Sequence, residues 1–175
     1  PPAGSPGHPG LGSRIPDSRK SSSRFGVESP YMEPQARRVA RTAETLDVRL
    51  RPEPDVRRRL SGPAVRTFFN IAADWRLSVA EQRALLGWPA ASTYHKYKAG
   101  DYGVLSYDTL TRLSLILGIY KSLQVLYPDQ PLADSWMRMP NTNPMFSGAT
   151  PLSLAADAGI DGLYRIRRLL DARRG

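Results

Sequence analysis

Residues 136–152, WMRMPNTNPMFSGATPL, constrain the fold more than any other part of the chain. Three prolines and a glycine exclude a continuous helix or strand, yet the segment also carries two large aromatic side chains and three methionines. A solvated linker does not need that much apolar surface. Asn141 and Asn143 predict a tight turn, and Thr150 followed by Pro151 predicts a helix start. We therefore expect an ordered, irregular loop that packs against helices.

The region before this loop has the pattern of short helices. Ser78 and Glu81 have the spacing of a capping box, which predicts a helix that ends at Gly87, and residues 90–98 predict another. Two short helices around a glycine-containing turn have the spacing of a helix-turn-helix. A preceding helix from Ala64 is predicted by apolar residues at steps of three and four: Val65, Phe68, Phe69, Ala72 and Trp75.

The remainder of the chain also predicts helices, and no segment alternates in the manner of a strand, so the expected fold class is all-α. Ser106 is expected to cap a fourth helix and Gly118 to bend it before residues 119–127. Further helices are expected at residues 131–137, 151–158 and 159–174. In the last of these, one apolar face is formed by Ile160, Leu163, Ile166 and Leu170.

Residues 1–60 are expected to form a basic extension that is disordered or partly helical. Residues 1–34 lack apolar periodicity, and prolines interrupt the remainder. A solvated linker is the favoured interpretation of residues 35–60, and a basic arm that touches DNA or an acidic partner is the alternative. The expected domains are this extension, a helix-turn-helix domain over residues 61–128 and a C-terminal domain over residues 129–175.

Composition narrows the possible functions. The formal net charge of +9 suggests a polyanionic partner, but the basic groups are spread along the chain. There is no cysteine and there are only two histidines, so we expect no catalytic residues, no metal site, no cofactor and no enzyme activity. The absence of cysteine also favours a reducing cytoplasm. The longest apolar run, at residues 113–120, is shorter than the ~20 residues that a membrane span needs.

The second helix of the predicted helix-turn-helix would enter the major groove of DNA. Tyr94 could reach a phosphate, and two lysines add positive charge, but no arginine or asparagine is placed for a bidentate base contact. We therefore expect this helix to discriminate only weakly between DNA sequences. The alternative is that the three-helix unit does not bind DNA and serves only as a scaffold. The predicted DNA-contacting residues are Ser92, Thr93, Tyr94, Lys96 and Lys98.

The order of features resembles the Xre/MbcA/ParS antitoxin family. An apolar helix ends near Tyr127, LADSWMRMPNTNPMFSGATPLSLA follows from Leu132, and Gly159 precedes a helix rich in arginine and leucine. The resemblance covers residues 64–175. It implies an antitoxin whose C-terminal region covers the active site of a NAD-consuming RES-domain toxin. As part of the toxin complex, the chain is expected to repress its own operon through the helix-turn-helix, and the symmetry of paired recognition helices suggests a dimer.

Two other functions remain open from the residues themselves. The chain could be a stand-alone helix-turn-helix regulator whose C-terminal domain only dimerises, or an adaptor that binds proteins without DNA. More arginines gather at the end of the last helix than stabilising the helix dipole requires. Under the antitoxin hypothesis, they occupy or block the cleft of the toxin. Trp136 and Phe146 are either core anchors, which is favoured, or interface residues. The predicted toxin-binding residues are Trp136, Asn141, Phe146, Arg167, Arg168, Arg173, Arg174 and Gly175.

Overall fold

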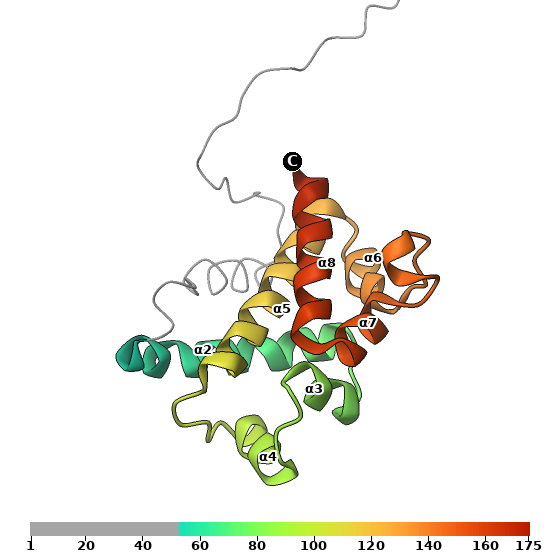
Figure 1. The fold of residues 1–175 in the computed structure, drawn as a ribbon. Helices are drawn as coiled ribbons and strands as arrows, with labels where there is room; N and C mark the ends of the chain where they lie inside the picture. Colours follow the sequence, from blue (N-terminus) through green and yellow to red (C-terminus); the bar gives the residue numbers. More distant parts are fainter. Residues whose placement is uncertain (1–52) are drawn as a thin grey trace, which may run out of the picture.

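A computed structural model of the chain describes residues 53–175, in which every regular element is helical (Figure 1). The all-α prediction is confirmed, and residues 1–52 of the predicted extension, which runs to residue 60, lie outside the described residues. The helices are α2 (Pro54–Asp74), α3 (Val79–Leu85), α4 (Ala91–Ala99), α5 (Tyr107–Leu126), α6 (Gln130–Ser135), α7 (Pro151–Asp157) and α8 (Gly159–Arg174). Two 3-10 turns, η2 (Trp136–Arg138) and η3 (Pro144–Phe146), lie between α6 and α7.

Helix α2 begins at Pro54, ten residues before the predicted start at Ala64. The linker interpretation is therefore wrong for residues 54–60. A proline is well tolerated in the first helical turn, because the N–H it lacks would have no partner there, and Asp55 suits the positive end of the helix dipole. Burial of Leu60 continues the apolar stripe back into this segment.

Helix α5 lies at the centre of the fold, with α2 on one side and α8 running alongside it (Figure 1). It is one continuous helix through Gly118, so residues 119–126 do not form the separate helix that a bend at Gly118 predicted. The guanidinium group of Arg167, from α8, occupies the space that a side chain at position 118 would fill. Gly118 therefore allows two helices to approach closely and does not break one of them.

The irregular segment between α6 and α7 is held by side-chain to backbone hydrogen bonds, as predicted. Asn141 Oδ1 accepts the N–H of Asn143 at 3.0 Å, and Asn143 Oδ1 accepts the N–H of Met145 at 3.0 Å. Thr150 Oγ1 then caps α7 by accepting the N–H of Ser153 at 3.1 Å. These bonds satisfy backbone groups that neither a helix nor a strand could satisfy here.

Helix α8 crosses α7 at a second glycine. An added Cβ at Gly162 would collide with the backbone carbonyl of Leu154. The apolar face of α8 packs against α5 and α7. Leu163, Ile166 and Leu170 are buried there, as the periodicity predicts, and Ile160 is half-buried. The position of α8 therefore depends on the missing side chain at residue 162.

We expect Gly162→Ala to lower the free energy of unfolding by about 1 to 3 kcal/mol. Alanine favours helices by about 1 kcal/mol, but a backbone carbonyl cannot move aside, so overpacking dominates. Gly118→Ala is the matched control, because there the neighbour is the end of the flexible Arg167 side chain. Urea denaturation measures both, and a Gly162→Ala protein as stable as wild type would contradict the packing argument.

Candidate functional site

The helix-turn-helix begins with the predicted capping box. Ser78 Oγ accepts the N–H of Glu81 at 3.2 Å, and Glu81 Oε2 accepts the N–H of Ser78 at 2.7 Å. Two of the free N–H groups at the start of α3 are satisfied in this way. The prediction from the Ser-x-x-Glu spacing is confirmed.

The turn between α3 and α4 is a Schellman motif centred on Gly87, which has φ +85°. The N–H of Gly87 bonds the carbonyl of Ala84 at 3.0 Å, and the N–H of Trp88 bonds the carbonyl of Arg83 at 2.7 Å. This motif ends α3 sharply, and α4 starts at Ala91. A short turn of defined shape therefore fixes the angle between the two helices.

Tyr94 anchors α4 to the core. Its side chain is 1% exposed, its hydroxyl donates to Gln82 Oε1 at 2.6 Å, and its ring packs edge-on against Phe69 at 6.0 Å between centroids. Gln82 Nε2 in turn donates to the carbonyl of Leu77 at 2.8 Å. Burial raises the pKa of the Tyr94 hydroxyl. Tyr94 thus positions α4 and is not available to contact a phosphate, which corrects its predicted role.

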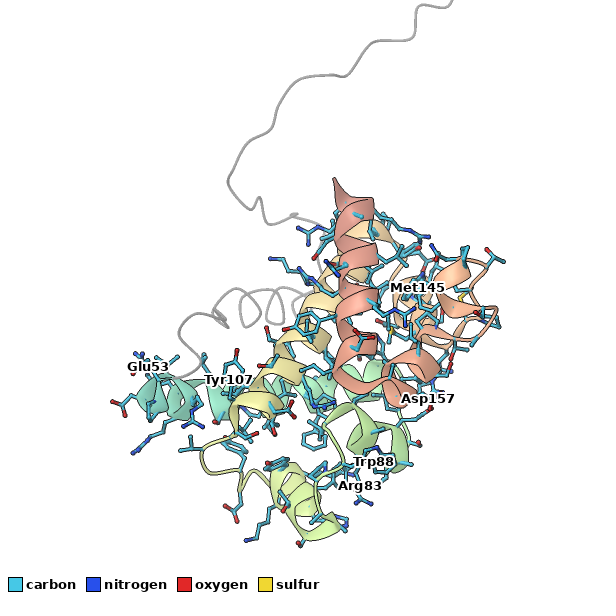
Figure 2. All side chains as sticks on the ribbon, in the orientation of Figure 1. Glu53, Arg83, Trp88, Tyr107, Met145 and Asp157 are labelled. Carbon is cyan, nitrogen blue, oxygen red and sulfur yellow. The ribbon has the colours of Figure 1, made fainter. Side chains whose placement is uncertain are left out.

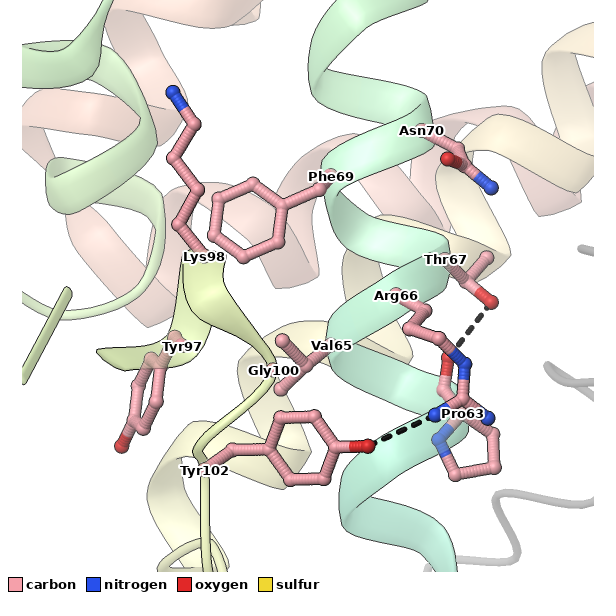
Figure 3. Close-up of a pocket in the computed structure, with 10 residues that line it drawn as sticks. All are labelled: Pro63, Val65, Arg66, Thr67, Phe69, Asn70, Tyr97, Lys98, Gly100 and Tyr102. Atoms are coloured by element: carbon pink, nitrogen blue, oxygen red, sulfur yellow. Dashed lines mark hydrogen bonds between the residues drawn. The ribbon is translucent and has the colours of Figure 1, made fainter. Parts of the chain in front are cut away.

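The other four predicted DNA-contacting residues of α4 do not share one face. Ser92 and Lys96 are exposed and lie one helical turn apart, so they form a single surface opposite Tyr94. Thr93 is half-buried beside them. Lys98 lies on another side of the helix, where it runs along the ring of Phe69 (Figure 3). The structure therefore brings together Ser92 and Lys96.

Lys98 borders a groove of about 530 Å³ between α2 and the end of α4 (Figure 3). Its aromatic wall includes Phe69 and Tyr102, and Arg66 Nη1 donates to the Tyr102 hydroxyl at 2.8 Å. The groove is cationic at its edge through Arg66 and Lys98. It lies beside the exposed face of α4, and the periodicity gave no indication of it.

Arg138 of η2 joins the C-terminal half of the chain to the helix-turn-helix. Its guanidinium donates to the carbonyl of Trp75 at 2.8 Å, to the carbonyl of Arg76 at 2.7 Å and to Glu81 Oε2 at 2.7 Å. We call these contacts the Arg138 clamp. Our sequence reasoning missed it, although an arginine within a largely apolar loop was a signal that it has a fixed partner.

Glu81 takes part in both the capping box and the Arg138 clamp. Partial burial would raise the pKa of its carboxyl, but hydrogen bonds from Arg138 and from Ser78 outweigh burial and lower the pKa below its ordinary value. A lowered folded-state pKa contributes stability at neutral pH, and this contribution is lost as the pH falls through the folded-state pKa. The clamp is therefore weakened in acid.

The predicted toxin-binding residues of the irregular segment are largely internal. Trp136 is 6% exposed and packs edge-on against Phe146, with 6.1 Å between ring centroids. This burial is what the favoured interpretation of the two rings as core anchors requires. Asn141 is half-buried and its side-chain oxygen holds the turn to Asn143.

The arginines at the end of α8 divide into two groups. Arg167 pairs with Asp171 at 2.8 Å, and Arg174 Nη1 reaches Ser122 Oγ of α5 at 3.4 Å. The Arg167–Asp171 pair lies within α8, whereas the Arg174 contact fastens the end of α8 to α5, and the Arg167 guanidinium packs against Gly118 of α5. The exposed members of the predicted set are Arg168, Arg173, Arg174 and Gly175, and of these Arg174 is the one with a contact to α5.

Two family models match successive parts of the chain. Residues 55–118 match the antitoxin Xre-like helix-turn-helix domain, and residues 122–175 match the antitoxin Xre/MbcA/ParS C-terminal toxin-binding domain. The chain belongs to the Xre/MbcA/ParS antitoxin family. The predicted resemblance is thus confirmed, and toxin and DNA are the partners that these two domains imply. Antitoxin and helix-turn-helix families are generally not enzymatic.

A relative of the antitoxin is the uncharacterized protein y4oB of Sinorhizobium fredii. The two are 44% identical over 108 residues, which cover 62% of this chain and 81% of the relative. No solved structure matches the antitoxin. Within residues 53–175, no three His, Asp or Glu side chains gather in a way that could hold a metal ion. None of the helices in that same range combines the length and the apolarity that crossing a membrane requires.

For this antitoxin we expect Arg138→Ala to lower the free energy of unfolding by about 1 to 2 kcal/mol, because hydrogen bonds to charged groups are strong but these are partly exposed. The pKa of Glu81 should rise toward its ordinary value. Carboxyl NMR titration and urea denaturation measure the two effects. Arg165→Ala is the control, since Arg165 has only a 4.0 Å contact with Asp161. If the two variants had the same free energy of unfolding and the same pKa of Glu81, the clamp would be contradicted.

Proposed function

We propose that this antitoxin binds a RES-domain toxin and inhibits its consumption of NAD by covering the active site, and that the complex represses its own operon. The observation that carries the proposal is the succession of a helix-turn-helix domain and a toxin-binding domain in one chain. The resemblance of residues 64–175 to antitoxins of RES toxins supports the choice of toxin. A cytoplasmic location follows from such a partner.

The end of α8 is the surface that we propose covers the toxin. Arg168 and Arg173 are exposed there, and arginine pairs well with carboxylates through two parallel hydrogen bonds. Arg174 reaches Ser122 of α5 and Arg167 packs against Gly118 of the same helix, so the exposed arginines are presented on a helix that is fixed to α5. Complementary charge at the rim of a cleft favours one orientation of docking.

The DNA-facing surface that we propose is the exposed side of α4, with Ser92 and Lys96 at its centre. The C-terminus lies at the end of the molecule opposite α4 (Figure 1). This separation allows operator DNA and toxin to be bound at the same time. We further propose a homodimer, because two copies of α4 would match operator half-sites about 34 Å apart.

The decisive experiment is coexpression of the antitoxin with RES-domain toxins, beginning with any that an adjacent gene encodes. We expect copurification and suppression of NAD loss, and operator binding by the complex in a mobility-shift assay. Absence of copurification with every RES toxin would refute the proposed target. Operator binding without any toxin partner would instead support a stand-alone regulator.

We expect the double substitution Arg168→Glu and Arg173→Glu to weaken toxin inhibition by about tenfold or more, since like charges at an interface repel and two charged contacts are lost. Both side chains are exposed, so the melting temperature should change little. The matched control is Arg165→Glu on the same helix, which should retain inhibition. NAD consumption at a series of antitoxin concentrations measures all three proteins, and full inhibition by the double variant would move the interface elsewhere.

We expect Lys96→Ala to lower operator affinity by about three- to tenfold and to reduce the salt slope by about one counterion, because it removes one phosphate contact. Lys98→Ala removes the same charge from another side of α4 and should have a smaller effect. Fluorescence anisotropy at several salt concentrations gives both quantities. A larger effect at Lys98 would place the phosphate backbone over the groove of Figure 3.

A further inference from the structure

Trp88, in the turn before α4, is held at the surface in an unfavourable backbone conformation. Its side chain is 59% exposed, whereas the other two tryptophans, Trp75 and Trp136, are 1% and 6% exposed. Its φ is +56°, in the left-handed region that bulky residues rarely adopt. Neither burial nor backbone preference explains a tryptophan at this position. Such strain often accompanies function.

Arg83 of α3 fixes the indole in place. The guanidinium carbon lies 5.6 Å from the centre of the Trp88 ring, within the range of a cation–π interaction. Its Nε and Nη2 both donate to the carbonyl of Pro89, at 3.2 and 2.9 Å. Arg83 therefore contacts both the ring of Trp88 and the backbone of the next residue, and it stabilises the strained turn through these two contacts. Figure 2 shows the two labelled side chains together at the α3–α4 end of the molecule.

The surroundings of Trp88 suit a polyanion. Between residues 82 and 100 there is no aspartate or glutamate, while the same segment contains Arg83, Lys96 and Lys98. Trp88 lies three residues before Ala91, where α4 begins, and Ser92 in the first turn of that helix is exposed. An apolar plane flanked by cations next to a recognition helix fits the major groove of duplex DNA, where phosphates line the edges of the groove and base edges lie between them.

We propose that Trp88 contacts operator DNA, packing its indole on a thymine methyl group or a deoxyribose at the edge of the major groove where α4 enters. This inference rests on the proposed operator binding and adds to it a contact residue that reads the groove by apolar contact. An apolar contact to a thymine methyl is one of the few ways to read sequence without a bidentate hydrogen bond. The contact of Trp88 would thus supply sequence discrimination that α4, which has no arginine or asparagine, cannot obtain from bidentate hydrogen bonds.

The test is Trp88→Gly. Glycine adopts positive φ freely, so the substitution relieves strain and the fold should be as stable as wild type or more so. We expect operator affinity to fall about tenfold with an unchanged salt slope, because no charge is removed. Trp88→Phe should lose less. Val125→Ala, which removes an exposed apolar side chain on α5, is the control and should bind the operator as wild type does.

A second measurement does not depend on any variant's folding. Trp88 is the exposed tryptophan of the three, so acrylamide quenching of the wild-type fluorescence reports on it. We expect operator DNA to protect this fluorescence. Unchanged affinity of Trp88→Gly together with no protection would overturn the proposal, and so would loss of toxin copurification by this variant with operator binding intact. If wild-type complex binds no operator, the proposed repression fails as well; if it binds without using Trp88, only this inference fails.

Discussion

Between residues 110 and 123, every residue of α5 is buried or half-buried, and this constrains the whole antitoxin. A helix that is apolar on most sides must be covered on most sides. Helix α2 covers one side and α8 another, so neither the helix-turn-helix half nor the toxin-binding half could hide α5 alone. The two family models meet between residues 118 and 122, inside this one helix. Two functions therefore share a single core.

Two arginines strengthen this union beyond apolar packing. Arg112 of α5 fills the space against Gly87 of the helix-turn-helix turn and also reaches Gly159, where α8 begins. Asp108 holds its guanidinium at 2.8 Å. Arg138 makes the second connection, from η2 to Glu81. Both glycines have positive φ, so the turns that make room for Arg112 are also the turns that end α3 and start α8.

Local chemistry was predictable from the sequence, and long-range contacts were not. The capping box at Ser78 and the helix start at Thr150 depend on a few neighbouring residues, so spacing alone revealed them. Gly118 was misread because a glycine that bends a helix and one that admits a second helix look the same until the partner is known. The same holds for Tyr94, whose hydroxyl suggests a surface role until its bond to Gln82 is seen.

The position of the Arg138 clamp separates two kinds of toxin contact. A toxin that touched only the exposed end of α8 would leave α3 undisturbed, because that end lies opposite α4. A toxin that displaced η2 would break the bonds from Arg138 to Trp75, Arg76 and Glu81 and so loosen the start of α3. The coupling between toxin and operator through this route cannot exceed the free energy of the clamp. At about 1 to 2 kcal/mol, that limit is a change of about 5- to 30-fold in operator affinity. A larger effect of toxin on the proposed operator binding would need a route other than the clamp, such as a change in the number of α4 helices that the complex presents to DNA.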